Sequence, residues 1–546
     1  MDNPTEDESH EPKVYCRRWA VLAVFCLLNA TNAALWVSYA AIAQREMARR
    51  RAKHMSDAGS NRLSRRGGVP RLASVHHEPH PFRWLQPAIL AASTELFAVD
   101  TSLINAFSLT FMFAYVPGTI IAAWGMDRFG LRPTLIAAAA GNVVCGVVRA
   151  LALEMLPSSK IGAWGVSLAA QCVGAMVQPA VTNAPAKLSG IWFPARERDM
   201  ATVLTAMSNP LGNAIGMFVP ALLVDSPSPS QFRDLLWGEA ALAAVGLVLA
   251  VLLIQSQPPT PPSASSGARE DLREESVRRF LSGAGSYLST PSGKDLGAPL
   301  VAAPPPPAGA SLVADGGATE EGGVSTLSRL WAECRALLGD RPFLLLLVAF
   351  SLGLGVFNSF VTLVAQIVAP CGYDSDAAGI FGGALIGAGL LGAGVAGFVL
   401  EATRAYTTAL RVGFCVCTAC VCGLLLLLQR NNGVALTVMF AVAGGAMLPL
   451  LPVTLEAACE HAFPVAEESA SALLMTGGQL VGIVGVLVMP LLIPETCDSP
   501  ITPFAISVVA LLVVGCALIL FFRVERRREA AEKRPAAVAD AEAVRA

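Results

Sequence analysis

Six side chains in the apolar stretches of this sequence could together bind a small organic molecule. Two are aromatic rings and four are amides, namely Trp36, Phe357, Asn32, Gln178, Asn209 and Gln479. The face of an aromatic ring attracts an organic cation, and an amide oxygen can turn its negative end toward a positive charge. As a set, these residue types favour a neutral or cationic ligand. For each residue taken singly, packing between helices is the competing interpretation.

Groups that could perform catalysis are scarce in the same stretches. Arg149 lies toward the end of one stretch, no Asp or Glu falls near the middle of any, and all six histidines lie outside them. Gly387, Gly389 and Gly392 form a G-x-G-x-x-G pattern, but no strand precedes it, so a nucleotide-binding loop is disfavoured. No nucleophile with a base and no metal-ligand set emerges. The sequence therefore predicts no enzyme, no catalytic residue, no bound metal and no cofactor.

Twelve apolar stretches carry these candidate ligands. Hydrophobic residues fill 54% of the 546 positions and charged residues only 15%, a balance too apolar for a soluble domain. A helix needs roughly 17 to 25 mostly apolar residues to cross a bilayer. The pattern predicts spans at residues 19–43, 104–124, 135–153, 163–189, 200–224, 236–254, 343–368, 377–400, 409–428, 434–455, 470–493 and 504–522. The expected fold is an all-α membrane protein.

The second six spans repeat the first six. Phe193 and Phe463 each begin a Phe-Pro-x-x-Glu segment, and their offset of 463 − 193 = 270 also maps Asn209 onto Gln479. Duplicated six-span halves place a substrate between them near the middle of the bilayer. We therefore expect two six-helix halves, with Asn209 and Gln479 facing each other across a central path.

Polar segments divide the chain around these halves. The expected regions are an N-terminus at 1–18, a first half at 19–256 with an insert at 41–86, a linker at 257–341, a second half at 342–522 and a tail at 523–546. The linker is rich in Pro, Ser, Ala and Gly, which predicts disorder, while two short amphipathic pieces at 277–288 and 327–338 leave surface helix and coil open. A thirteenth span at 85–99 is disfavoured, because it would reverse the side of every later loop.

Basic residues gather on one side of the predicted spans, except in the insert, where residues 45–83 place ten basic residues against three acids on the outer side. Arg17 and Arg18 precede the first span, Arg128 and Arg132 follow the second, and an Arg-rich tail begins at Arg523. Lys and Arg are enriched in cytoplasmic loops of membrane proteins. Both termini are therefore expected in the cytosol.

Charged residues of these inner loops are candidates for a gate. They are Asp127, Arg128 and Arg132 after the second span, and Glu401 and Arg404 after the eighth. We expect the two arginines of the first half to approach acids of the second half and to hold the inner gate closed. The acids within reach of such a contact are Glu456, Glu460, Glu467 and Glu468.

Two of the thirteen cysteines fall outside the spans in loops of the outer side. Cys371 follows the seventh span and Cys497 follows the eleventh, so both belong to the second half. Disulfides persist outside the cytosol. The pattern predicts a disulfide between Cys371 and Cys497.

Several motifs resemble those of the feline leukaemia virus subgroup C receptor-related transporters, a branch of the major facilitator superfamily. They include Arg17-Arg18-Trp19, the segment from Asp127 to Arg132, the segment from Met207 to Gly212, and Gln479. The resemblance covers nearly all twelve spans and places this chain among the orphan-like members. It implies the twelve-span major facilitator fold, alternating access, and a plasma-membrane transporter that acts as a monomer.

The resemblance also implies a substrate class. Better-known members of the family are implicated in transport of choline and ethanolamine, and in export of haem. Their cation site uses a Trp at the place of Trp36 and glutamines that correspond to Gln178 and Gln479. A Tyr of that site is replaced by Asn358 here, and Phe357 is the candidate for the missing ring.

Three functions therefore stay open from the sequence: a facilitator of choline-like or ethanolamine-like cations, a haem exporter, and a non-transporting membrane sensor or receptor. The expected partners are a small organic solute and the lipid bilayer, and not nucleic acid.

Overall fold

The computed structural model describes residues 15–38, 97, 101–223, 229–260, 262, 264–281, 326–373, 375–494, 496–497 and 499–531. Every regular element in these ranges is a helix. The insert predicted at 41–86 lies outside them, as do all residues but Phe97 of the disfavoured span at 85–99.

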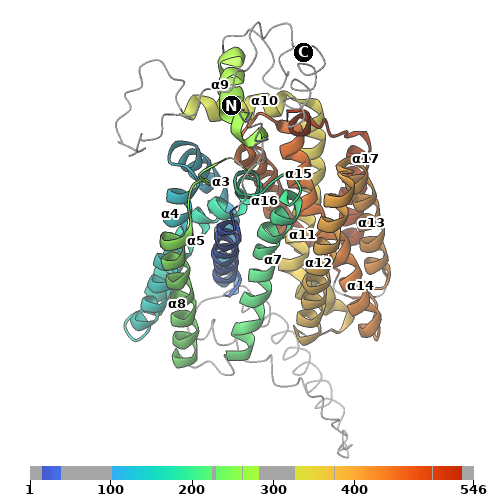
Figure 1. Cartoon of the computed structure of the whole chain (residues 1–546). Helices are drawn as coiled ribbons and strands as arrows, with labels where there is room; N and C mark the ends of the chain where they lie inside the picture. The colour runs from blue at the N-terminus through green and yellow to red at the C-terminus, as the bar shows by residue number, and fades with distance from the viewer. Residues whose placement is uncertain are drawn as a thin grey trace, which may run out of the picture.

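The first half holds the first span and six further helices that match the predicted stretches (Figure 1). The first span runs from Arg17 to Ser38. The others are α3 (Thr101–Arg128), α4 (Leu131–Ala152), α5 (Lys160–Thr182), α6 (Pro185–Trp192), α7 (Arg198–Leu223) and α8 (Pro229–Leu253).

The second half repeats this order. Its helices are α11 (Arg341–Val368), α12 (Ser375–Thr403), α13 (Tyr406–Leu426), α14 (Gly433–Met447), α15 (Leu450–Ala462), α16 (Glu467–Leu492) and α17 (Pro503–Phe521). Among the described residues, 11 helical segments are long and apolar enough to cross a membrane. Helix α7 covers the remaining predicted span, so the predicted all-α membrane fold is confirmed.

Proline divides one span in each half. The predicted fourth span is two helices, because α5 ends at Thr182 and α6 begins at Pro185. The tenth span is likewise divided between α14 and α15, where Pro449 caps the second helix. Proline cannot donate a backbone hydrogen bond and disfavours helix in the residue before it. The repeat thus extends to a matching break in the fourth and tenth spans.

Glycines let helices approach closely at the same two places in the repeat. A Cβ atom on Gly212 of α7 would overlap the backbone of Ala30 in the first span. In the second half, a Cβ atom on Gly355 of α11 would lie 3.1 Å from the backbone nitrogen of Gly482 in α16, the residue equivalent to Gly212. Small residues allow such contacts between helices in membranes. Each half therefore presents one tightly packed helix pair to the centre of the molecule.

Two helices lie in the linker at 257–341, and they limit the predicted disorder to the rest of it. Helix α9 (Ala264–Leu281) and helix α10 (Thr326–Gly339) lie at the top of the bundle in Figure 1. Arg273 of α9 and Glu333 of α10 are buried, and their contacts hold the helices in place. We call this end of the bundle, where the first span begins and α17 ends, the terminal end.

The opposite end carries the predicted cysteine pair. Cys371 follows α11 and Cys497 lies between α16 and α17, and their Cα atoms are 4.8 Å apart with the sulfur atoms joined. This Cα separation is within the usual range for a disulfide. The bond would tie the two loops of the second half together.

Candidate functional site

A cavity lies between the two halves, where the close helix pairs meet, and holds about 610 Å³ of empty space when the part open to solvent is included. Its polar lining is made of six amides and two hydroxyl groups: Asn29, Gln178, Asn209, Asn213, Asn358, Gln479, Tyr115 and Thr182. The rings of Trp36 and Phe357 and several aliphatic side chains complete the wall. The described lining contains no acidic or basic side chain.

Five of the six predicted ligand residues line this cavity, and Asn32 does not. The Asn32 amide nitrogen donates hydrogen bonds to Asn142 Oδ1 at 2.7 Å and to the Gly174 carbonyl at 3.0 Å. These contacts face α4 and α5 rather than the centre. Asn32 therefore joins helices, which corrects its assignment as a substrate ligand.

Two amide pairs occupy equivalent positions in the two halves. Asn209 Nδ2 of α7 donates to Asn29 Oδ1 of the first span at 3.1 Å. Asn358 Nδ2 of α11 donates to Gln479 Oε1 of α16 at 3.3 Å. The first span with α7, and α11 with α16, are the pairs that the glycines bring together. The internal repeat thus produces one amide pair on each side of the cavity.

Aromatic rings form the other part of the wall. Trp36 stacks on Phe111 of α3 with ring centroids 5.8 Å apart and an interplanar angle of 21°. Its indole Nε1 is buried and has no hydrogen-bond partner among the described residues. Tyr115, absent from the predicted set, adds a ring whose hydroxyl donates to Asn183 Oδ1 at 2.7 Å. The spacing of Phe111 and Tyr115, four residues apart on one helix, could have signalled this aromatic face.

A buried ion pair supports the backbone of Trp36. Arg149 donates to the Leu35 carbonyl and to Ser38 Oγ, both at 2.9 Å, and lies 3.4 Å from a Glu239 oxygen. Gln171 Nε2 also reaches the Trp36 carbonyl at 3.4 Å. Glu239 of α8, whose side chain is 12% exposed, was not among the predicted residues. It neutralises Arg149 instead of facing the cavity.

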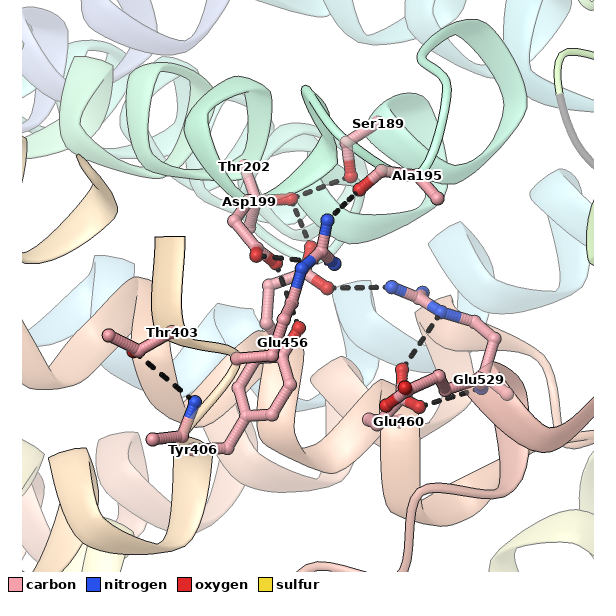
Figure 2. A network of polar contacts seen from close by, with 12 residues as sticks. Ser189, Ala195, Asp199, Thr202, Thr403, Tyr406, Glu456, Glu460 and Glu529 are labelled. Carbon is pink, nitrogen blue, oxygen red and sulfur yellow. Dashed lines mark hydrogen bonds and ion pairs between the residues drawn. The ribbon is translucent and has the colours of Figure 1, made fainter. Parts of the chain in front are cut away.

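Charged side chains instead join the halves at the terminal end. Lys187 Nζ of α6 lies 2.5 Å from Glu468 of α16. Asp199 of α7 is 3.4 Å from Arg404 and accepts a hydrogen bond from the Tyr406 hydroxyl at 3.0 Å. Figure 2 shows Asp199 meeting the second half close to Glu456. These contacts join the two halves at this end of the bundle.

The tail contributes the most buried of these cations. Arg528, only 1% exposed, lies 2.9 Å from Glu456, 3.3 Å from Glu460 and 3.0 Å from Glu467. Burial lowers the pKa of the Arg528 guanidinium, but the three carboxylates outweigh it and hold the pKa well above its usual range. Glu456 also accepts a hydrogen bond from Thr202 of the first half. The tail thus neutralises acids of the second half, one of which contacts the first half.

A linker helix joins the halves in the same way. Arg273 of α9 lies 2.5 Å from Asp127 at the end of α3 and 2.6 Å from Glu333 of α10. Glu333 in turn accepts a hydrogen bond from Ser469 Oγ of α16 at 2.6 Å. Burial disfavours the charged guanidinium, but its acidic neighbours raise the pKa of Arg273 well above its ordinary value.

The acids of the second half pair with other cations than the sequence predicts. Arg128 and Arg132 were expected to meet the acids of the second half, but Lys187 and Arg528 pair with those acids. Arg132 instead donates to the Val251 carbonyl of its own half at 3.1 Å. Two of the other predicted gate residues, Asp127 and Arg404, do form ion pairs at the terminal end. Glu401 is half-buried near the end of α12.

Two six-span halves around a central cavity are the architecture of transporters whose halves move against each other. The profile of the Major Facilitator Superfamily matches residues 82–486, and the chain therefore belongs to that superfamily. Its members are transporters rather than enzymes, in agreement with the sequence prediction.

Individual relatives show to which members of the superfamily this chain is similar. Solute carrier family 49 member A3 of Danio rerio is 26% identical over 544 residues, which cover 97% of this chain and 92% of the relative. The choline/ethanolamine transporter flvcr2a of Danio rerio is 24% identical and covers 89% of this chain and 92% of its own length. The choline/ethanolamine transporter FLVCR1 of Felis catus is 24% identical, with 77% of this chain and 66% of the relative covered. The chain is thus related to the solute carrier 49 and FLVCR proteins, as its motifs predicted.

Solved structures show the same fold. The E. coli fucose:proton symporter FucP aligns with a TM-score of 0.56 at 11% identity, covering 92% of this chain and 98% of the symporter. The proton:xylose symporter XylE aligns with a TM-score of 0.56 at 12% identity, covering 94% of this chain and 100% of XylE. At 11% and 12% identity, the similarity is evidence for the fold alone.

Proposed function

We propose that this chain carries a small organic cation of the choline or ethanolamine type across the membrane by alternating access. The observation that carries the proposal is the chemistry of the central cavity. Its described lining offers six amides and the rings of Trp36, Phe357 and Tyr115, without a charged group. Two relatives whose names specify choline and ethanolamine transport support the same class.

A quaternary ammonium suits such a cavity physically. It spreads its charge over methyl groups, which donate no strong hydrogen bond and are held by ring faces at about 0.5 to 2 kcal/mol per contact. The amide oxygens around the rings add their negative dipole ends. Since the attraction needs no carboxylate, the cavity can release the ion again without separating an ion pair.

The same lining disfavours haem as the substrate. Haem iron is commonly bound by a histidine or a thiolate. The described cavity wall contains neither, and His461 lies at the terminal end, where its Nε2 is 2.9 Å from Asp340. The organic cation is therefore the better-supported cargo.

We further propose that the terminal end faces the cytosol of a plasma-membrane protein and that its ion pairs form the inner gate. The cytoplasmic enrichment of Lys and Arg in membrane proteins supports this orientation. Lys187–Glu468 and Arg404–Asp199 link the halves directly, and Arg273 and Arg528 neutralise the acids around them. In this arrangement the cavity loads from the opposite side, and release inward requires these pairs to separate. Both halves lie in one chain, so a monomer suffices.

Uptake of radiolabelled choline in cells that express the chain tests this function. We expect uptake above that of empty cells, and a Trp36→Ala variant with KM raised about 2-fold to 30-fold, the equivalent of about 0.5 to 2 kcal/mol. Trp237→Ala is the matched control, because Trp237 is 42% exposed on the outside of α8. Its KM should stay unchanged.

Two results would contradict the proposal. Uptake equal to that of empty cells, with normal surface expression, would remove choline, and a normal KM for Trp36→Ala would remove the aromatic site. Reconstituted vesicles distinguish a transporter from a sensor, since a sensor would bind choline without net flux.

A further inference from the structure

A second cavity adjoins the central one, is lined mostly by the second half, and holds about 520 Å³ of empty space when its open part is included. The two cavities share four lining residues: Pro210, Leu354, Phe357 and Leu451. Phe357, the ring that the proposed cation site draws from the second half, thus stands between them. We call this second cavity the annex.

The annex differs from the central cavity in its chemistry. Its own walls are Phe350 and Gly353 of α11, Phe414 and Cys417 of α13, Met447 of α14 and Leu512 of α17. Phe350, Phe414 and Leu512 are at most 3% exposed, so they belong to the protein interior and not to its lipid-facing surface. The described wall carries no amide, hydroxyl or charged side chain. An apolar cavity of this kind excludes water and accepts apolar groups.

Because the polar central cavity and the apolar annex adjoin, a ligand that fills both must have a polar or charged part and an apolar part. A charged head among the rings and amides of the central cavity can extend an apolar substituent past Leu354 and Phe357 into the annex. We propose that the chain binds amphiphilic organic cations, namely quaternary ammonium ions that bear an alkyl or aryl group, and that the annex receives this group. The proposal rests on the cation site proposed above and specifies its substrate class.

The test compares ammonium ions that differ only in their apolar group. The purified full chain in lipid nanodiscs is titrated calorimetrically with tetramethylammonium, butyltrimethylammonium, hexyltrimethylammonium and benzyltrimethylammonium. Burial of one methylene is worth about 0.8 kcal/mol, so we expect the dissociation constant to fall about fourfold per added carbon. Hexyltrimethylammonium should bind more tightly than tetramethylammonium by two or more orders of magnitude.

A variant that fills the annex makes the test specific. Gly353 lines the annex and not the central cavity, and a Cβ atom there would lie 3.6 Å from the nearest atom of Phe414. That is ordinary contact, so the backbone tolerates Gly353→Leu while the larger side chain occupies the annex. The gain with chain length should disappear in this variant, and tetramethylammonium should bind as before. Gly387→Leu is the matched control, since a Cβ atom on Gly387 meets nothing within 4 Å.

The outcomes separate this inference from the function on which it rests. Binding of tetramethylammonium without any gain for longer chains would overturn the annex and leave the cation site standing. A gain that survives in Gly353→Leu would also overturn it, because the apolar group would then lie elsewhere. Absence of binding by every ammonium ion would remove the cation site, and the annex proposal with it.

Discussion

The central cavity and the terminal end of this protein differ sharply in their use of charge. The described wall of the cavity is built from neutral amides and rings. The terminal end, by contrast, buries Arg528 among three glutamates and Arg273 between Asp127 and Glu333. The protein thus keeps its strongest electrostatic interactions out of the cavity wall and uses them between the halves.

This difference separates the neutral groups proposed to bind the ligand from the charged groups proposed to form the gate. A buried ion pair is expensive to break in a dry environment, because each separated charge loses its partner before it gains water. Such pairs suit a gate, which becomes wet as it opens. The same charges beside the ligand would either repel a cation or hold it too strongly for release. Four changes test this division, in order of expected effect.

The largest effect is expected from Arg528→Gln, which leaves Glu456, Glu460 and Glu467 without their shared cation. Removal of one partner of a buried ion pair costs about 3 to 5 kcal/mol. The melting temperature in detergent should therefore fall clearly. The buried thiol of Cys459 in α15 should also become accessible to alkylation, as mass spectrometry of the peptide would show.

Arg523→Gln is the control for this variant, because Arg523 lies exposed in the same segment. It should change neither melting nor alkylation. If Arg528→Gln melts like the unmodified chain, the tail is no part of the gate.

The next effect concerns the pair that links the halves directly. In a double-mutant cycle of Lys187→Met and Glu468→Gln, we expect a coupling energy of about 1.5 to 3 kcal/mol, typical of a hydrogen bond between charged groups. Lys187→Met should also raise alkylation of Cys459. The pair of Arg18 and Glu197, 2.9 Å apart within the first half, is the control. Its removal should leave the alkylation rate unchanged, and equal rates for both pairs would refute a gating role of Lys187.

A third change introduces a charge into the neutral cavity. Asn213 lines the cavity, and its Oδ1 has no hydrogen-bond partner among the described residues. In Asn213→Asp the new carboxylate should attract the cation by at least about 1.4 kcal/mol once it is ionised, a tenfold gain in affinity. Choline affinity should then rise with pH in the variant and stay constant in the unmodified chain. A variant without pH dependence would place the cation away from Asn213.

The smallest effect should come from the two amide pairs. Asn209→Ala and Gln479→Ala each remove an amide that lines the cavity, and with it one proposed polar contact to the substrate, worth about 0.5 to 1.5 kcal/mol. Each should raise the KM for choline by about 2-fold to 12-fold, and the internal repeat predicts similar values for both. Leu204→Ala, a residue exposed on the outside of α7, serves as the control. A strongly unequal pair of values would show that one half binds the substrate alone.

Much of this molecule could be predicted from local patterns in its sequence. Apolar stretches of sufficient length must form helices in a bilayer, because their backbone groups find no other hydrogen-bond partners there. The offset between Phe193 and Phe463 predicted two related halves, and with them the placement of Asn209 and Gln479 around one cavity. The type of each side chain was enough to suggest the neutral chemistry of that cavity.

Only the tertiary structure decided which groups meet across the chain. Asn32 and Gln178 are both amides in apolar spans, yet one joins helices and the other lines the cavity. Arg528 and Arg273 lie in segments that read as solvated tail and linker, but they are buried against acids far away in the sequence. A helix pattern fixes which residues share a face, whereas the partner of that face depends on how the helices pack. Long flexible side chains such as arginine can reach several partners, and the packed arrangement of carboxylates selects among them.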